Sequence, residues 1–352
     1  MRARLVEAAA LRRTACDGNV VQPAASMSGI GVQRIEPQTA EPPAIRLKTM
    51  SAEADQCPLF DQAAEFVAAM WPQYGPSSEM HIGDLAWGTL RTWPSAVTSL
   101  RLWPDSGGQT QVLTMFDGSG VCDLVVRPGP VGLETTTHAL EWAESTALEA
   151  AVGDGPIELR VGRRLQSTGV VELLHARGFE RLAGGVPAMS RTIAVTDVAA
   201  LATPGDYAIR ELRFDDLGSR VLAFNAAFPG EELRVDAYRA LRACSLYNPR
   251  LDVVAISPSS EVAAFATLWL DTHNGVVQIE PAGCHPDHRR LGLARSVIQQ
   301  GLRWSVELGA TAALVRHISS NTAAKALYES CGFLTACEDT GFVKTIRLTN
   351  SG

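Results

Sequence analysis

The chain has 352 residues, of which 46% are hydrophobic and 20% charged, and its formal net charge is -7. This composition is typical of a globular protein with a full core, and the acidic balance argues against a nucleic-acid clamp or a membrane-surface protein. The longest apolar run, Val262 to Leu270, falls well short of the ~18 residues that cross a bilayer. We therefore expect a cytoplasmic protein without nucleic-acid or membrane partners.

Residues 1–55 differ in composition from the rest of the chain. They combine several arginines with a loose Ala/Ser/Gly stretch and the proline-rich segment EPQTAEPPAIR. The apolar stretch LVEAAAL is too short for a secretory signal and contains Glu7, and a transit peptide is the alternative. We expect a disordered arm or an over-long start, with Met27 and Met50 as alternative initiators, and leave it out of the fold.

The remaining sequence contains an internal echo. ELLHARGFERLAGGVPAMSRTI ends at Ile193, and ALYESCGFLTACEDTGFVKTI ends at Ile346. In each, a short helical run ends on Gly-Phe, and a strand closes on Arg/Lys-Thr-Ile. The pattern predicts two similar units, 56–200 and 206–350, divided near Pro204-Gly205; chance similarity between generic α/β segments is the alternative.

The second unit gives the clearer pattern of elements. In chain order we predict strand 207–211, helices 215–228 and 233–243, strands 251–256, 262–270 and 276–284, helix 294–308, strand 312–317, helix 322–330 and strand 342–348. Asn274-Gly275 is a strong hairpin signal. The order is a β-meander followed by a βαβ crossover. We therefore expect a mixed α/β (α+β) fold in which each domain has a mixed, mostly antiparallel sheet flanked by helices.

The strongest local signal is CHPDHRRLGLARS, residues 284–296, at a strand-to-helix junction. Arg289, Gly292 and Ala294 give the spacing R-x-x-G-x-A. Gly292 permits close approach of a ligand to the backbone, and the helix start offers unpaired N–H groups and a positive dipole end. Together with Arg290 and Arg295, this loop suits a diphosphate; a solvated basic turn is the alternative.

The strand before this loop is unusual as well. Pro281 removes a ladder donor and Gly283 removes a side chain. Such a strand pairs poorly with its neighbour, so its backbone groups are left for an extended ligand.

These features resemble the GNAT (Gcn5-related) N-acetyltransferase superfamily over residues 206–348, with Asn321 and Tyr328 at the family's positions in NTAAKALYESCGF. The duplicated layout looks most like tandem-domain, mycothiol-synthase-like acetyltransferases of actinobacteria. The resemblance implies acetyl-CoA as co-substrate. It assigns the acetyl-pantetheine arm to Ala282, Gly283 and Cys284, and the pyrophosphate to Arg289, Arg290, Leu291, Gly292, Leu293 and Ala294, with Asn321 also in the cofactor site. Cys284 and Ala294 depart from the commonest family residues, but both are small. Asn321 also has a structural role open to it, as N-cap of the next helix.

The same resemblance makes Tyr328 the general acid that returns a proton to the departing thiolate. A phenol with a pKa near 10 suits this role, and a packed aromatic is the alternative. Glu280 is the candidate base, acting through water, against the alternative of an exposed strand residue; His317 is second. Cys284 is not expected to be a nucleophile, since the family transfers the acetyl group directly.

Cysteine and histidine spacing gives no sign of a metal site. The seven cysteines form an odd set without a CxxC pair, and none of the seven histidines lies in an HxxxH arrangement. Reduced thiols explain this better than disulfides or zinc, so we expect no metal.

The first unit lacks a counterpart of the basic loop at residues 284–296. Val126-Arg127-Pro128 matches the strand end, but GPVGLETT follows where the basic residues should be, which places Glu134 near the expected pyrophosphate position. His175 lies near the position that corresponds to Tyr328. We expect a degenerate, structural or substrate-shaping domain.

The sequence as a whole predicts an acyltransferase, monomeric or homodimeric, that moves an acetyl group to a primary amine of a small molecule, with its active site in the second unit. An acetyl-CoA-binding regulatory or partner protein without turnover is one alternative. A protein or peptide N-acetyltransferase is the other.

Overall fold

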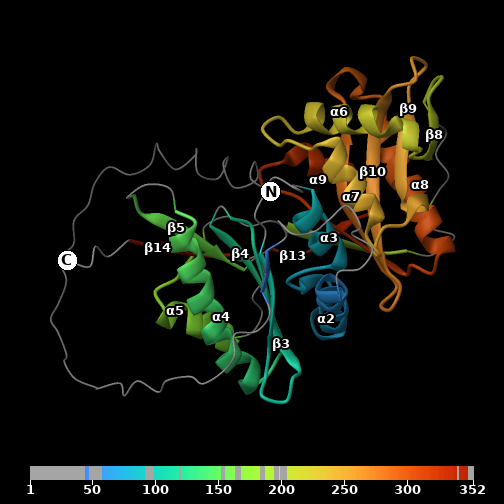
Figure 1. The fold of residues 1–352 in the computed structure, drawn as a ribbon. Helices are drawn as coiled ribbons and strands as arrows, with labels where there is room; N and C mark the ends of the chain where they lie inside the picture. The colour runs from blue at the N-terminus through green and yellow to red at the C-terminus, as the bar shows by residue number, and fades with distance from the viewer. Residues whose placement is uncertain are drawn as a thin grey trace, which may run out of the picture.

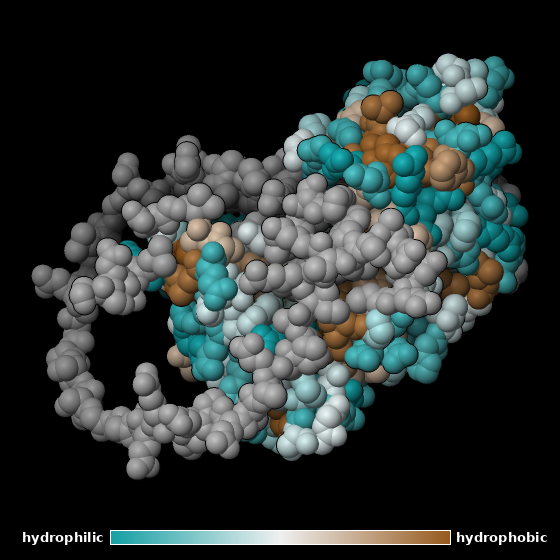
Figure 2. All heavy atoms as spheres, in the orientation of Figure 1, coloured by the Kyte–Doolittle hydropathy of each residue, from teal (hydrophilic) through white to brown (hydrophobic). Residues whose placement is uncertain are grey.

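The computed structural model describes residues 44–46, 58–91, 99–118, 120–151, 155–162, 168–182, 187–193, 198, 204–338 and 341–347. Figure 1 shows two sheet-and-helix units, one on each side of the molecule. The expected arm, apart from three of its residues, lies outside the described residues. On the visible face hydrophilic residues predominate, with smaller apolar areas between them (Figure 2), and no helix in the described ranges is long and apolar enough to span a bilayer.

The first unit begins with a strand that lies within residues 1–55. Its elements are β1 (Ala44–Arg46), α2 (Pro58–Tyr74), α3 (Ile82–Leu90), β2 (Ser99–Pro104), β3 (Thr110–Phe116), β4 (Val121–Val126), α4 (Pro130–Glu149), β5 (Ile157–Val161), α5 (Thr168–Ala176), β6 (Glu180–Arg181) and β7 (Pro187–Thr192). Because β1 pairs antiparallel with β2, the prediction that all of residues 1–55 stand outside the fold is wrong for this strand.

The second unit repeats that order element for element. Its elements are β8 (Ala208–Glu211), α6 (Leu217–Ala227), α7 (Val235–Ala243), β9 (Asp252–Ile256), β10 (Val262–Asp271), β11 (Val276–Cys284), α8 (Leu293–Glu307), β12 (Ala312–Arg316), α9 (Thr322–Ser330), β13 (Leu334–Glu338) and β14 (Phe342–Ile346). The predicted tandem α/β fold is confirmed, and the predicted elements agree to within a few residues. β13 was not predicted.

The two units exchange their last strands. One sheet has the order β1-β2-β3-β4-β5-β14-β6, and the other has the order β13-β7-β12-β11-β10-β9-β8. Thus β7 of the first unit lies between β12 and β13 of the second, and β14 lies between β5 and β6 of the first. In each sheet only one internal pair, β4–β5 or β11–β12, is parallel. Each sheet is therefore completed by a strand from the other unit, which the ranges 56–200 and 206–350 did not anticipate.

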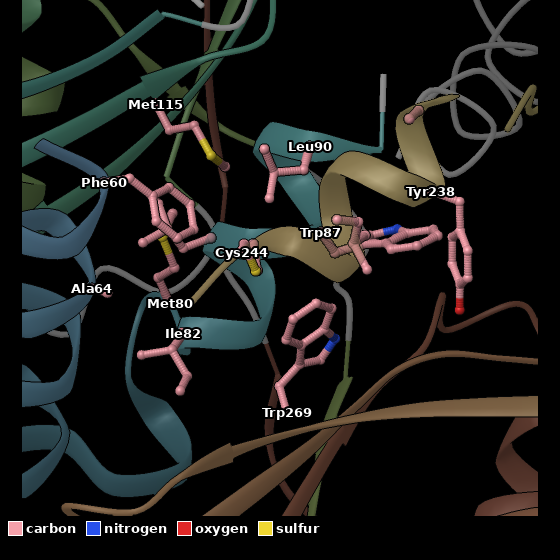
Figure 3. Packing of buried hydrophobic residues seen from close by; sticks show 14 of the residues in the cluster. Phe60, Ala64, Met80, Ile82, Trp87, Leu90, Met115, Tyr238, Cys244 and Trp269 are labelled. Atoms are coloured by element: carbon pink, nitrogen blue, oxygen red, sulfur yellow. The ribbon is translucent and has the colours of Figure 1, made fainter. Parts of the chain in front are cut away.

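A shared apolar core joins the units. α8 covers one face of the second sheet, while α6, α7 and the first unit's α3 cover the other. Figure 3 shows side chains of α2 and α3, such as Phe60 and Trp87, together with Tyr238 of α7 and Trp269 of β10. A Cβ atom on Gly83 would come within 2.8 Å of the Trp269 ring, so α3 packs directly on β10. The first unit is thus part of the second unit's core.

Polar contacts strengthen this junction. Asp84 of α3 pairs with Arg316 at the end of β12 and accepts a hydrogen bond from Gln278 Nε2 of β11 at 2.7 Å. Arg316 and Gln278 are buried. A buried ion pair is costly to break from one side, because the remaining charge is left without its partner. Asp84 therefore holds two strands of the other unit together at one point.

His81, which precedes α3, makes this junction sensitive to pH. Its Nδ1 accepts a hydrogen bond from Gly83 N, and burial lowers its pKa below the ordinary 6.5 despite the nearby carboxylates of Asp84 and Asp271. The folded state therefore favours the neutral ring. Its contribution to stability is complete above about pH 6.5 and is lost as the pH falls below that value, by up to about 1.4 kcal/mol per pH unit.

Urea unfolding between about pH 7 and pH 5 measures this loss. His81→Asn keeps an acceptor at the N-cap but has no ionisable ring, so its stability should depend less steeply on pH than that of the wild type. Equal slopes for the two proteins would contradict the assignment.

Candidate functional site

β11 and β12 separate at the centre of the second sheet. Their parallel ladder runs from the pair Val276 and Ala312 to the pair Ile279 and Val315, and it ends there. β11 continues to Cys284, paired along its other edge with β10. Residues 282–284 keep their pairing with β10, so the predicted weak pairing is found only on the other edge of β11. No strand in the described part of the chain pairs with that edge beyond Ile279, which suits an extended ligand.

Gly283 has a packing role that sequence reasoning missed. A Cβ atom there would lie 2.5 Å from the Phe265 ring and 3.2 Å from Ala227 of α6. Packing by α6 and β10 therefore requires glycine at this position whether or not a cofactor binds. The glycine is therefore no evidence for a ligand. The binding role predicted for Ala282, Gly283 and Cys284 is supported only by the open edge of β11.

Residues 285–292 connect β11 to α8 and have the geometry of an anion-binding loop. Arg290 and Gly292 both adopt left-handed backbone conformations, with φ of 65° and 77°. Gly292 is the N-cap of α8, and no side chain caps the helix. Its first N–H groups therefore lack intrahelical partners and point out of the helix end, as the diphosphate prediction requires.

Positive charge surrounds that helix end. Arg289, Arg290 and Arg295 have exposed side chains, and Leu291 is also exposed. The Arg289 Nε donates to the carbonyl of Cys284 at 3.4 Å, so its guanidinium reaches back over the end of β11. Leu293 is buried under the loop in the α8 core. The structure brings together the loop residues predicted from 289 to 294.

Two further contacts fix the loop. Tyr207, just before β8, has its hydroxyl 2.8 Å from His288 Nδ1. The Cys284 thiol donates to the His288 carbonyl at 3.3 Å. Burial raises the pKa of the Cys284 thiol, and Arg289 opposes this only in part. Cys284 therefore stays a thiol at neutral pH, which agrees with the expectation that it is not a nucleophile.

Tyr328 lies on α9, the helix that follows β12. Its side chain is 7% exposed and packs against Phe333 and His317, with ring centroids 6.1 and 6.2 Å away. Tyr328 is therefore a packed aromatic residue, as the alternative stated. The same packing holds its ring in place, and this ring carries the hydroxyl that the family resemblance assigns as the general acid. Asn321 likewise has its structural role, since its side chain accepts a hydrogen bond from Ala324 N at the start of α9.

His317, directly after β12, has a more specific arrangement than the sequence indicated. Its Nδ1 lies 2.8 Å from the Ile318 carbonyl. A carbonyl only accepts, so Nδ1 carries the proton and Nε2 of the neutral ring has a free lone pair. Nε2 is buried, and no described residue forms a hydrogen bond with it. Only the fold shows that this ring lies next to the Tyr328 ring, tilted by 38°.

Glu280 is buried rather than an exposed strand residue. It is 8% exposed, and its backbone carbonyl accepts a hydrogen bond from Trp269 Nε1 at 2.6 Å. Ile279 packs in the α8 core, so the alternation of β11 directs Glu280 to the opposite face of the sheet. The alternative of an exposed residue is therefore wrong, and Glu280 stays a candidate base.

The matching position of the first unit is occupied. Arg127 N donates to Gln111 O as His285 N donates to Ala263 O, which aligns Val126 with Cys284. The Val126 N–H, which points away from β3, donates to the Glu79 carboxylate at 3.0 Å. Only residues 127–129 connect β4 to α4. A carboxylate thus takes the backbone donor that a cofactor would use there, and the loop is too short to surround a diphosphate.

Replacing Glu134 by alanine should leave acetyl-CoA affinity unchanged. Glu134 is exposed on α4, in a unit whose loop does not form a phosphate site. Calorimetric titration of wild type and Glu134→Ala checks this. A clear gain or loss of affinity would mean that the first unit takes part in cofactor binding.

Comparison with known proteins agrees with this geometry. Residues 219–333 match the profile of the acetyltransferase (GNAT) family. A GCN5-related N-acetyltransferase from Sphaerobacter thermophilus superposes with a TM-score of 0.57 at 17% identity, covering 86% of this chain and 95% of that one. A tandem GNAT protein from the clavulanic acid biosynthesis pathway gives 0.57 at 15% identity, covering 83% and 96%. No curated protein matches the chain.

The fold and the matched segment together define a protein of two tandem GNAT-fold units. The segment that matches the GNAT acetyltransferase profile, residues 219–333, contains the open strand edge, the loop and all of α9. This supports the assignment of the chain as an acyltransferase.

Proposed function

We propose that the chain is an acetyl-CoA-dependent N-acetyltransferase that acts on a primary amine of a small molecule, with its active site in the second unit. The observation that carries the proposal is the combination of an unpaired β11 edge with an uncapped, arginine-rich helix start. The first suits an extended amide-bearing arm, and the second suits a diphosphate. Acetyl-CoA contains both parts in one molecule.

The residues present fit each part of this co-substrate. The backbone of Ala282, Gly283 and Cys284 pairs with the pantetheine amides. The N–H groups of residues 291–294 and the guanidinium groups of Arg289 and Arg290 receive the pyrophosphate. The thioester then lies where β11 and β12 separate, between Glu280 and the helix that carries Tyr328. Of the described residues, no His/Cys/Asp/Glu group could hold a metal ion, and direct acetyl transfer requires none.

The chemistry is direct attack. The neutral amine nitrogen adds to the thioester carbonyl, the C–S bond breaks, and the leaving thiolate takes a proton from Tyr328. The nitrogen loses its remaining extra proton to water as the amide forms, and this proton restores the Tyr328 hydroxyl through solvent. The acceptor arrives as an ammonium ion and loses its proton to Glu280 through water. His317 Nε2 is the second acceptor, since it is buried and no residue in the described ranges shares its lone pair.

A thiol-release assay across a panel of amines tests the proposal. The panel contains small aliphatic amines, an amino sugar, a cysteinyl amino sugar of the kind used by mycothiol-synthase-like enzymes, and a short peptide. We expect release of CoA with one small amine and accumulation of its acetylated product. Binding of acetyl-CoA without release on any amine would favour a regulatory protein, and turnover on the peptide alone would favour a protein acetyltransferase.

A further inference from the structure

A strand of the first unit lies beside the catalytic elements proposed in the second. β7 pairs antiparallel with β12 along one edge and with β13 along the other. β12 leads into His317, and β13 follows α9, which carries Tyr328. β7 therefore sets the distance between β12, which leads into His317, and β13, which follows the helix of Tyr328.

Arg191 of β7 binds the end of α9. Its Nη1 donates to the Cys331 carbonyl at 2.5 Å, at the C-cap of the helix. Its guanidinium lies against Gly332, where a Cβ atom would come within 3.2 Å of Nε and Cζ. A cation at this end satisfies one of the open carbonyls and complements the negative end of the helix dipole.

The same helix end holds Tyr328. The Tyr328 carbonyl accepts hydrogen bonds from Cys331 N at 2.9 Å and Phe333 N at 3.1 Å, and its ring packs against the buried Phe333 ring. Arg191 thus acts on the turn that fixes both the backbone and the ring of Tyr328.

At its other end β7 binds the residue beside that ring. The Pro187 carbonyl accepts a hydrogen bond from His317 N at 3.3 Å. His317 and Tyr328, whose rings lie next to each other, are therefore each tied to β7 by a separate contact.

We propose that β7 of the first unit positions Tyr328 and His317 for proton transfer, with Arg191 as the positioning residue. The proposal rests on the proposed function. In it the first unit completes the active site of the second unit, in addition to stabilising the core. Arg191 itself touches neither substrate nor the reacting atoms.

Three variants test the proposal. Arg191→Met removes the charge and the hydrogen bond but keeps an apolar stem, Arg191→Lys keeps the charge, and Arg177→Met is the matched control. Arg177 belongs to the first unit and pairs with Glu141 and Glu144 of α4.

We expect Arg191→Met to lower kcat about 10-fold while KM for acetyl-CoA changes less than about 2-fold, because a displaced acid slows the proton transfer without altering the phosphate loop. Arg191→Lys should recover most of kcat, and Arg177→Met should resemble the wild type. Hydrogen exchange of a peptide covering residues 322–333 should be faster in Arg191→Met, while the peptide covering α8 is unchanged.

Unchanged kcat and unchanged exchange in α9 would overturn the proposal, as would equal loosening of all segments with kcat and KM changed together. A wild type without turnover on any amine would refute the proposed function instead. In that case the exchange measurement still decides whether Arg191 holds α9.

Discussion

Acetyl-CoA at about 100 times its dissociation constant is expected to raise the Tm of the wild-type protein by about 5 °C, and Arg289→Glu is expected to abolish this shift. Ligand binding at that excess stabilises a folded protein by about 2.7 kcal/mol, which corresponds to several degrees for a protein of this size. Arg289 lies over the end of β11 at an uncapped helix start, so a carboxylate there would repel the diphosphate that the loop is built to receive.

Arg239→Glu is the matched control for this charge reversal. Arg239 is exposed on α7, stacked near the Phe214 ring, and belongs to the same unit without being part of the loop. Its variant should keep the full shift in Tm. A shift that persists in Arg289→Glu would show that the ligand binds elsewhere.

Tyr328→Phe is expected to lower kcat by about 10²- to 10⁴-fold and to leave acetyl-CoA affinity nearly unchanged. The substitution removes the hydroxyl that protonates the leaving thiolate, and general acid catalysis contributes about that much. The ring itself packs against Phe333 and His317, and phenylalanine preserves this packing. Turnover kinetics and calorimetric titration of the same preparation separate the two effects.

Tyr74→Phe controls for the loss of a phenol hydroxyl in general. Tyr74 ends α2 in the first unit. Its variant should turn over at the wild-type rate. If Tyr328→Phe did so as well, Tyr328 would be a packing residue and the acid would lie elsewhere.

Much of the fold could be predicted because the local signals agree with the tertiary structure. Asn274-Gly275 marks the β10–β11 hairpin, and Asn321 marks the start of α9. The repeated Gly-Phe and Thr-Ile endings indicated two units, which the element order confirms. These signals involve residues that are close together in the sequence, so they can be recognised without knowledge of the tertiary structure.

The strand exchange could not be predicted, because β7 and β14 have similar sequences and fit the same gap in either sheet. Pattern alone cannot decide whether such a strand joins its own unit or the other. For the same reason the roles of Asp84 and Arg191 were missed, since each contacts a residue more than a hundred positions away along the chain.

At the candidate site, the loop could be predicted from the sequence, but the state of His317, the burial of Glu280 and the role of Glu79 could not. The R-x-x-G-x-A spacing is local, and Gly292 adopts the left-handed conformation that the motif needs. The tautomer of His317 and the burial of Glu280 depend on contacts across the sheet. Glu79, whose carboxylate accepts the hydrogen bond from Val126 N, is nearly fifty residues from that partner, and no local pattern identifies it.

The central claim is that the second unit alone has a working cofactor site. The stoichiometry of acetyl-CoA binding, measured by isothermal titration calorimetry on the full chain, tests it most directly. We expect one molecule bound per chain, with heat of binding lost in Arg289→Glu and retained in Arg239→Glu. Two molecules per chain, or binding that persists in Arg289→Glu, would contradict the account.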